Sequence, residues 1–324
     1  MAFPFNYFLA AFVGAFLTTL LTMPGWRQWC LRVNLVDDPG DRKIHDVPMP
    51  LAGGLAVLTG VLAPLAAGLL YAASTVQDLH MLPPIAYGFN HRAWELAGIA
   101  LGAIAITALG CLDDKRELKP LPKFAGQFTV ALLVALSGAR ITLFVHSLAF
   151  SYAITILWLL TVINAFNFMD NMNGLCAGLG AIGAALFTLI AASQGQYLVA
   201  LTGFLMCGAL LGFLPYNFPH ARAFLGDSGS HLVGYLLAVM AILPHFYTKK
   251  YPHPLAVLSP LLVLAVPLLD LVQVVVLRTL RRKPFWLGDT NHLSHRLVRA
   301  GMSPTRAVLC LWLMALVIGL FAAL

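Results

Sequence analysis

The chain has 324 residues, of which 60% are hydrophobic and only 10% are charged. Soluble globular domains carry about 25% charged residues, so this composition excludes an ordinary soluble protein and equally a disordered chain. The 20 basic residues outnumber the 13 acidic ones, but they lie between apolar runs, as in the cytoplasmic loops of membrane proteins. This distribution argues against a nucleic-acid-binding protein. The sequence predicts an all-α, polytopic membrane protein that forms a single domain over residues 1–324.

Long apolar runs predict about ten transmembrane helices, because one span needs roughly 20 apolar residues. In chain order, the expected helices are Phe3–Met23, Leu51–Ala73, Trp94–Leu112, Phe124–Leu136, Tyr152–Ile163 with a continuation to Phe168, Leu175–Ala192, Tyr197–Leu214, Leu232–Leu243, Pro260–Leu277 and Ala307–Leu324. The apolar segment Ile141–Phe150 is too short for a separate span. We expect it to be an interfacial strand or the start of the fifth helix.

The distribution of positive charge predicts the orientation of these helices. If the first loop is cytoplasmic, 16 of the 20 Lys and Arg residues lie in cytoplasmic loops, which is a strong positive-inside bias. Both termini are then non-cytoplasmic. Most acidic residues fall on the cytoplasmic side as well, and Asp270 lies inside the ninth expected span near its cytoplasmic end. We therefore expect the polar chemistry to gather at the cytoplasmic face.

Five polar segments on that side carry the candidate functional residues. In chain order they are Asp37–Gly54, Asp113–Pro120, Asn164–Leu175, Phe224–Ser230 and Asn291–Arg296. The adjacent carboxylates of Asp113 and Asp114 repel each other and need a cation or a basic partner. Asn164, Asn167 and Asp170 recur every three residues, so a helix end would place them on one face. Their oxygens can bind a hard cation or the edge of a base.

Each of these segments also has a purely structural interpretation. The paired acids can form a solvated turn with their basic neighbours, the amides can cap a helix, and Gly226–Gly229 can be a simple turn. His292 and His295 have a spacing that could bind zinc, but no cysteine or acidic residue lies nearby at ligand spacing. We therefore favour phosphate contacts for these histidines together with Arg296.

Taken together, the segments from about Val36 to Arg296 resemble the polyprenyl-phosphate N-acetylhexosamine-1-phosphate transferase family in order and spacing. The segments Asp41–His45 and Asn291–Arg296 are similar to the WecA/TagO branch, whose histidine segment reads NHLHHRL, with Ser294 at the third position of its HLHH cluster. Bacterial members usually read DGxDGL where this chain has Asp170–Leu175, with the sequence DNMNGL. Asn173 in place of the second Asp resembles the eukaryotic branch, a departure that bears on nucleotide or sugar preference.

The resemblance implies a phosphoglycosyl transferase. The expected reaction moves N-acetylhexosamine-1-phosphate, foremost GlcNAc-1-phosphate, from a UDP-sugar to undecaprenyl or another polyprenyl phosphate and releases UMP. This would be the first membrane step of a cell-envelope glycan pathway. The implied cofactor is Mg²⁺, with Mn²⁺ as the alternative, and the implied partners are the UDP-N-acetylhexosamine, the polyprenyl phosphate and the membrane, without nucleic acid. A homodimer is left open. The expected location is the cell membrane, with the active site on its cytoplasmic face.

The resemblance also implies roles for individual residues. Asp227 and Asn167 are assigned to the metal, and Asp113 and Asp114 to activating and positioning the acceptor, with Asp227 as the third catalytic residue. The residues expected to bind substrate are Lys43, His45, Asn164, Asp170, Asn173, His292, His295 and Arg296.

Three alternative functions stay open from sequence. The first is a phospho-N-acetylmuramoyl-pentapeptide transferase. The second is an ion-coupled transporter, suggested by the number of spans and by Asp270. Transporters usually place ionisable groups near the bilayer midplane, whereas here they lie at one face. The third is an inactive family member, suggested by Asn171 and Asn173.

Overall fold

The computed structural model describes residues 5–38, 47–74, 92–142, 145, 147–243, 257–284 and 290–322. Within these ranges the helices are α1 (Phe5–Arg32), α2 (Gly53–Ser74), α4 (Ala93–Arg116), α5 (Pro120–Leu136), α6 (Leu148–Met169), α7 (Leu175–Ser193), α8 (Tyr197–Asn217), α9 (Gly226–Met240), α10 (Ser259–Val263), α11 (Ala265–Leu280), α12 (Leu293–Arg299) and α13 (Pro304–Leu320). Two short strands, β1 (Val36–Asp37) and β2 (Met49–Pro50), pair in antiparallel register.

Six of the described helices, α1, α2, α4, α6, α7 and α8, are long and apolar enough to cross a membrane. The helices α5 and α13 are apolar but shorter. The chain is therefore a polytopic helical membrane protein, as its composition predicts. The expected total of ten spans stays a prediction. The expected all-α class agrees with the described fold, in which the only strands are the two-residue pair β1 and β2.

Helix ends differ from the apolar runs where polar residues or prolines decide them. The first helix continues to Arg32 and does not end at Met23. The expected span Pro260–Leu277 is divided into α10 and α11 at Leu264. Pro267 explains the break, because it has no N–H to bond the carbonyl four residues earlier and its ring crowds that position.

The described residues of the segment before α6 do not form a strand, so the expected interfacial strand is wrong for them. The helix α6 begins at Leu148, where the Ser147 side chain accepts a hydrogen bond from the Phe150 N–H. Ahead of it, the Ile141 N–H donates to Thr155 Oγ1 at 2.9 Å and Ser151 Oγ donates to the Ile141 carbonyl at 2.7 Å. This segment is therefore tied to the first turns of α6, and of the expected start of the fifth helix only Leu148–Phe150 are helical.

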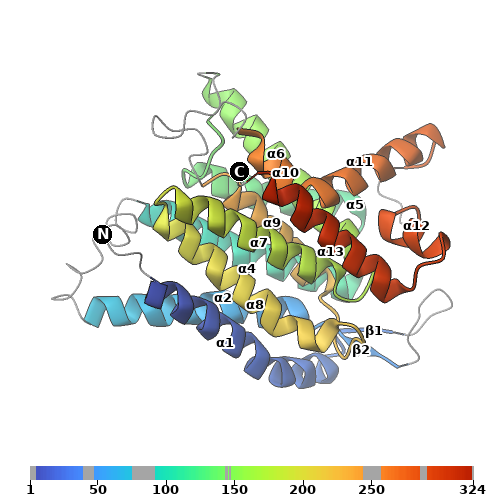
Figure 1. Cartoon of the computed structure of the whole chain (residues 1–324), viewed down its shortest axis with the longest axis horizontal. Coiled ribbons are helices and arrows are strands. Elements are labelled where there is room, and N and C mark those ends of the chain that lie inside the picture. The colour runs from blue at the N-terminus through green and yellow to red at the C-terminus, as the bar shows by residue number, and fades with distance from the viewer. Residues whose placement is uncertain are drawn as a thin grey trace.

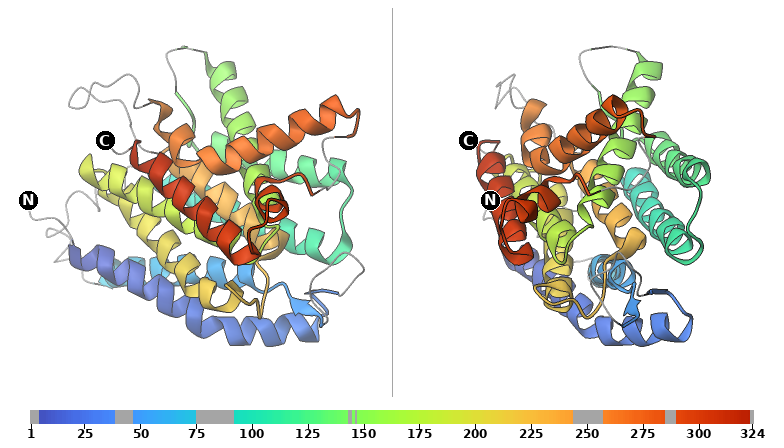
Figure 2. Two further views of the ribbon diagram at one scale, coloured as in Figure 1. Left: turned by 45° about the vertical axis from the view of Figure 1, so that its right-hand side comes forward. Right: turned by 90° about the vertical axis from the view of Figure 1, so that its right-hand side faces the viewer.

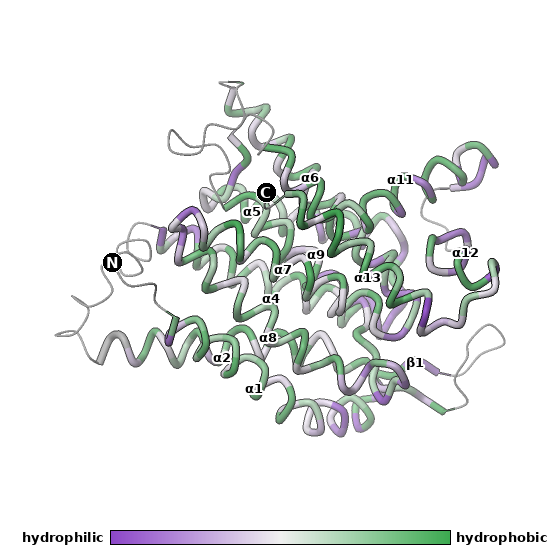
Figure 3. The backbone as a smooth tube through the Cα atoms, in the orientation of Figure 1, coloured by the Kyte–Doolittle hydropathy of each residue, from purple (hydrophilic) through white to green (hydrophobic). Residues whose placement is uncertain are grey.

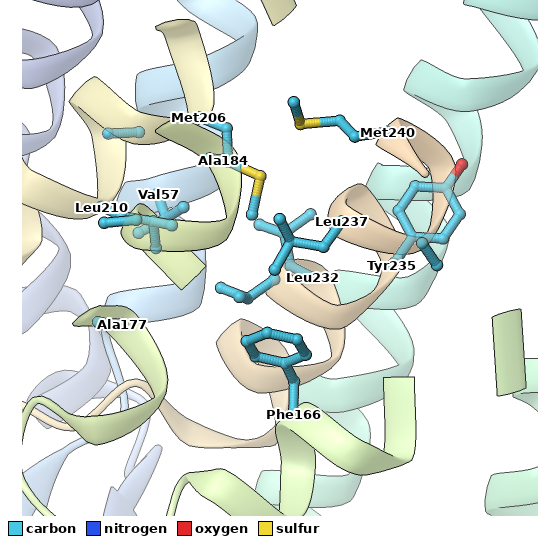
Figure 4. Packing of buried hydrophobic residues seen from close by; sticks show 14 of the residues in the cluster. Val57, Phe166, Ala177, Ala184, Met206, Leu210, Leu232, Tyr235, Leu237 and Met240 are labelled. Carbon is cyan, nitrogen blue, oxygen red and sulfur yellow. The ribbon is translucent and has the colours of Figure 1, made fainter. Parts of the chain in front are cut away.

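The helix α9 lies at the centre of the bundle, in contact with α2, α4, α6 and α7. Nearly all of its side chains are buried. Figure 4 shows Leu232 and Leu237 of α9 beside Phe166 of α6 and Met206 and Leu210 of α8. Because α9 is apolar around most of its circumference, it is stable only when other helices cover it.

Several helix ends that carry polar motifs meet on one side of the bundle. The carboxyl ends of α4 and α6 and the amino ends of α5 and α9 lie toward the side of β1, β2 and α12, whereas α1 begins and α13 ends on the opposite side (Figures 1 and 2). Figure 3 shows hydrophilic residues at β1 and α12 and hydrophobic ones along the middle of the long helices. The fold thus positions a polar site at one end of an apolar bundle.

Candidate active site

The first turn of α9 carries Asp227, at the position where hydropathy predicts only a loop. The helix begins at Gly226, six residues before the expected Leu232, because its first turn is made of small and polar residues. Gly226 has φ +73, and a Cβ there would lie 2.8 Å from Asp114 Oδ2. Glycine therefore meets both the left-handed backbone and the close approach of the carboxylate.

Asp114, at the end of α4, holds this turn in place. The Asp227 N–H donates to Asp114 Oδ1 at 2.7 Å, and the Ser228 N–H donates to Asp114 Oδ2 at 3.1 Å. A helix leaves its first N–H groups without internal partners, and the residue before α9, Leu225, supplies no side-chain cap. A carboxylate from another helix therefore takes the place of the cap, and both of its oxygens are used in doing so.

Replacing Asp114 with asparagine should separate this positioning role from direct chemistry. Asparagine offers one acceptor, so one of the two N–H groups would face an amide NH₂. We expect a loss of about 2 kcal/mol in stability and at least a tenfold drop in turnover. Thermal unfolding in detergent and initial rates measure the two effects. Glu117→Gln, at an exposed carboxylate directly after α4, is the matched control, since it leaves both bonds to α9 intact. An Asp114→Asn variant as stable as the wild type would contradict this role.

Asp113 faces the interior of the site and is joined to Asp227 through a lysine. Asp113 Oδ1 accepts the Leu118 N–H at 2.8 Å, and Asp113 Oδ2 lies 2.7 Å from Lys123 Nζ. Lys123 Nζ also lies 2.8 Å from Asp227 Oδ2 and 3.4 Å from Asn167 Oδ1. An ammonium group has three donors, so Lys123 contacts oxygens from α4, α9 and α6 at once.

Lys123 is a residue that the sequence reasoning counted only as a positive loop charge. The expected helix begins at Phe124, whereas α5 begins at Pro120, so that Lys123 lies in its first turn. Proline is favoured at the first position of a helix, and this signal could have shown that Lys123 projects from a helix beside the paired acids.

The carboxyl end of α6 completes the polar cluster. Asn167 Nδ2 donates to Asp227 Oδ1 at 2.6 Å and to Ser230 Oγ at 3.0 Å. Asp170 follows the last residue of α6; its burial raises the pKa of its carboxyl group well above the usual value, and the charges of Asp227 and Asp114 raise it further. The structure thus brings the four predicted carboxylates and Asn167 into one cluster, which we call the acidic cluster: Asp113, Asp114, Asn167, Asp170 and Asp227.

A network of amides lies one turn deeper and fixes a buried histidine that sequence reasoning did not single out. Asn164 Nδ2 donates to the Leu160 carbonyl and to Gln127 Oε1, each at 2.8 Å. The Gln127 amide therefore turns its Nε2 toward His231 Nε2, 3.3 Å away. Since an amide nitrogen only donates, His231 accepts at Nε2 and carries its proton on Nδ1. The expected role of Asn164 in substrate binding stays a prediction, and the side-chain hydrogen bonds described here place Asn164 in this network.

The acidic cluster fits a divalent cation. Asp113, Asp227 and His231 each offer an atom that lies within 4.8 Å of the others. His231 carries a proton on Nδ1 and uses Nε2 as an acceptor, which leaves carboxylate and amide oxygens as the available ligands. Hard cations such as Mg²⁺ prefer oxygen ligands. Asp113 and Asp227 share the single ammonium of Lys123, so a further positive charge is favoured there.

The short helix α12 carries the predicted histidines and lies beside the end of α6. His292, which is 6% exposed, packs edge-on against the Phe168 ring with 5.4 Å between centroids. His295 is half-buried and Arg296 is exposed. Ser294 Oγ donates to Asn171 Oδ1 at 2.7 Å, so two residues at which this chain departs from the expected motifs contact each other.

Three predicted substrate residues lie outside these groups. The Asn173 side chain is exposed, and its Nδ2 donates to the Pro219 carbonyl at 3.2 Å. Lys43 and His45 lie outside the residues that the structure describes, so their expected phosphate contacts stay predictions.

Comparison with known proteins decides the family. The model of the family "Glycosyl transferase family 4" matches residues 96–245, which include the whole acidic cluster. A Mycobacterium tuberculosis relative, a decaprenyl-phosphate N-acetylglucosaminephosphotransferase, is 33% identical over 97% of this chain and 81% of its own length. The chain belongs to glycosyl transferase family 4.

Other relatives of this glycosyl transferase family 4 protein are similar over nearly its whole length. A Bacillus subtilis protein named a probable undecaprenyl-phosphate N-acetylglucosaminyl 1-phosphate transferase is 31% identical over 97% of this chain and 84% of its own length. The Escherichia coli undecaprenyl-phosphate alpha-N-acetylglucosaminyl 1-phosphate transferase is 27% identical over 94% of this chain and 80% of its own. These matches confirm the family that the motifs predict.

Proposed function

We propose that this chain transfers GlcNAc-1-phosphate from UDP-GlcNAc to a polyprenyl phosphate and releases UMP. The matches with this chain cover at least 80% of the length of three relatives that are named for this transfer. The observation that carries the proposal is the acidic cluster with Lys123, which four helices bring together at one end of an apolar bundle. A soluble anionic donor and a lipid phosphate can meet only at such an end.

The residues of the acidic cluster suit the reaction. Asp227, Asn167 and Asp113 would hold the Mg²⁺ ion, which when bound neutralises charge on the diphosphate. The acceptor phosphate has a second pKa near 6, so it is mostly a dianion at neutral pH and little deprotonation is required. Its oxygen bonds to the sugar-linked phosphorus of the donor, the bond from that phosphorus to the bridging oxygen breaks, and UMP leaves. Lys123 is placed to stabilise the charge that gathers there.

The remaining predicted residues would bind the ends of the substrates. Asp170 and Asn173 are proposed to contact the uracil and ribose, and His292, His295 and Arg296 the phosphates and the sugar. Asp170 directly follows α6 and lies near Asp227, and the His292 ring packs against Phe168 at the carboxyl end of α6. These positions support the assignment.

We infer that the acidic cluster faces the cytoplasm. Sixteen of the 20 Lys and Arg residues, among them Lys115, Lys119 and Arg281, lie in the loops expected to be cytoplasmic under the positive-inside rule. The ends of α1 and α13 that lie nearest to the termini are on the opposite side of the bundle, which supports non-cytoplasmic termini and an even number of spans.

A reconstituted assay with defined substrates tests the proposed function. Purified protein is incubated with undecaprenyl phosphate, Mg²⁺ and one UDP-sugar at a time, and the lipid product is identified by mass spectrometry alongside UMP release. We expect a lipid diphosphate carrying GlcNAc, with activity lost in EDTA and restored by Mg²⁺. A product only with UDP-muramoyl pentapeptide would assign the alternative transferase, and absence of UMP release with every donor would contradict enzyme function.

A further inference from the structure

A buried acid lies outside the acidic cluster and is bonded to one of the predicted substrate residues. Asp270 of α11 is 0% exposed. Its Oδ2 lies 2.7 Å from His292 Nδ1, and its Oδ1 accepts the Leu293 N–H at 2.6 Å. Both carboxylate oxygens are therefore used at the start of α12. In the sequence this acid suggests a transporter, whereas the structure assigns it a local partner.

The contact with Asp270 fixes which nitrogen of His292 carries the proton. A carboxylate only accepts hydrogen bonds, so Nδ1 must be the donor. The ring nitrogen that remains for a substrate is Nε2. The partner of one ring nitrogen commonly sets the tautomer and orientation of a functional histidine.

Other contacts fix α12 from the opposite side and bring His292 to the end of α6. Ser294 Oγ donates to Asn171 Oδ1, just after α6. The His292 ring lies edge-on to the ring of Phe168, and the Arg278 guanidinium of α11 lies 5.0 Å from the centre of the same Phe168 ring. Phe168 directly follows Asn167, which donates to Asp227. His292 is thus held between α11 and the helix end that carries part of the acidic cluster.

We propose that Asp270 is a positioning residue, which orients His292 and directs its Nε2 to the diphosphate of the substrate. The proposal rests on the proposed function, in which His292 contacts a phosphate. Asp270 itself touches no substrate. It acts by holding the imidazole in one tautomer and one ring orientation, so its removal should change turnover only through His292.

Asp270→Asn is the informative change, because it keeps the shape and alters the hydrogen bonding. If its Oδ1 still accepts the Leu293 N–H, its Nδ2 faces His292 Nδ1 as a donor and moves the imidazole proton to Nε2. Partners of this kind typically affect activity about 10- to 100-fold, and we expect a kcat reduction in that range with an altered pH profile. In a His292→Gln background, which lacks the imidazole, Asp270→Asn should cause no further loss.

Two matched variants separate positioning from packing. Gln273, one turn after Asp270 on α11, donates to the Asn291 carbonyl at 3.2 Å, so Gln273→Leu removes a neighbouring contact to the same segment without touching His292. We expect it to keep the wild-type rate and pH profile. His292→Asn can keep a bond to Asp270 but lacks Nε2, and we expect it to fold normally and lose at least about tenfold in kcat. This variant tests the proposal even if Asp270→Asn does not fold.

Several results would overturn the proposal. They are wild-type kinetics of Asp270→Asn, additive losses in the double variant, an equal loss in Gln273→Leu, or full activity of a stable His292→Asn. Each of these results is compared with the wild-type protein, which must itself make the lipid product. Failure of the wild type itself would instead contradict the proposed function, so the two failures are distinguishable.

Discussion

Replacing Asp227 with alanine is expected to abolish transfer, with a drop of at least about 10³-fold in kcat. Asp227 Oδ2 lies 2.8 Å from Lys123 Nζ, and its Oδ1 accepts from Asn167 Nδ2 at 2.6 Å. The substitution removes an oxygen ligand proposed for the cation and an anion that holds Lys123 and Asn167. Preorganised groups at a site of developing charge commonly contribute several kcal/mol each. UMP release and lipid product, measured at saturating substrates with Mg²⁺, check this result.

The loss must be separated from misfolding. Asp227→Asn keeps the side-chain volume and both N–H groups that bind Asp114, so it should fold and remain inactive. Thermal unfolding should show that Mg²⁺ stabilises the wild type and has little effect on Asp227→Asn, because a ligand that binds the native state raises its apparent stability. Wild-type rates in either variant would remove Asp227 from the reaction.

Replacing Lys123 with methionine is expected to give the second large effect, a loss of at least about 100-fold in kcat/KM. Methionine keeps most of the length and apolar character but leaves Asp113 and Asp227 facing each other without the ammonium. Breaking a largely buried ion pair by removing one partner typically costs about 3–5 kcal/mol, and the Lys123 side chain is 18% exposed. We therefore expect lower stability of the metal-free protein as well as lost activity.

Added Mg²⁺ distinguishes two roles of Lys123. If the lysine only neutralised the acids, a high Mg²⁺ concentration would restore both stability and rate. We expect the stability to recover and the rate to stay low, because the ammonium is also proposed to bind the reacting phosphates. Lys123→Arg is the matched control, since it keeps the charge with a different donor geometry. Full activity of Lys123→Met would contradict this role.

Sequence reasoning predicted the helical membrane fold and the members of the acidic cluster because both leave local signals. Apolar runs mark most helices, and the three-residue spacing of Asn164, Asn167 and Asp170 places the two asparagines on the last turns of α6 and Asp170 directly after them. The same reasoning predicted the start of α9 wrongly. Its first turn, at Gly226, contains small and polar residues, so hydropathy starts the helix at Leu232 and leaves Asp227 in a turn.

Other features depend on contacts between distant segments and leave no local signal. Asp114 and Asp113 are adjacent in the chain, yet one caps α9 and the other faces Lys123. Neighbouring residues on a helix point in different directions, and only the packing of α4 against α9 and α5 decides which of them does what. Asp270 meets His292 across 22 residues of sequence, so its role could not be inferred from its place in an apolar run.

Close backbone contacts surround the first turn of α9, which carries Asp227. A Cβ on Gly54 of α2 would collide with the Gly229 nitrogen, and one on Gly110 of α4 would collide with Ser228 of α9. The backbones of α2, α4 and α9 therefore pack directly against one another around the turn that carries Asp227. Divergence in donor sugar is accordingly expected to accumulate in α12 and in the turn after α6, which side-chain hydrogen bonds such as those of Ser294 and Asn173 connect to their neighbours.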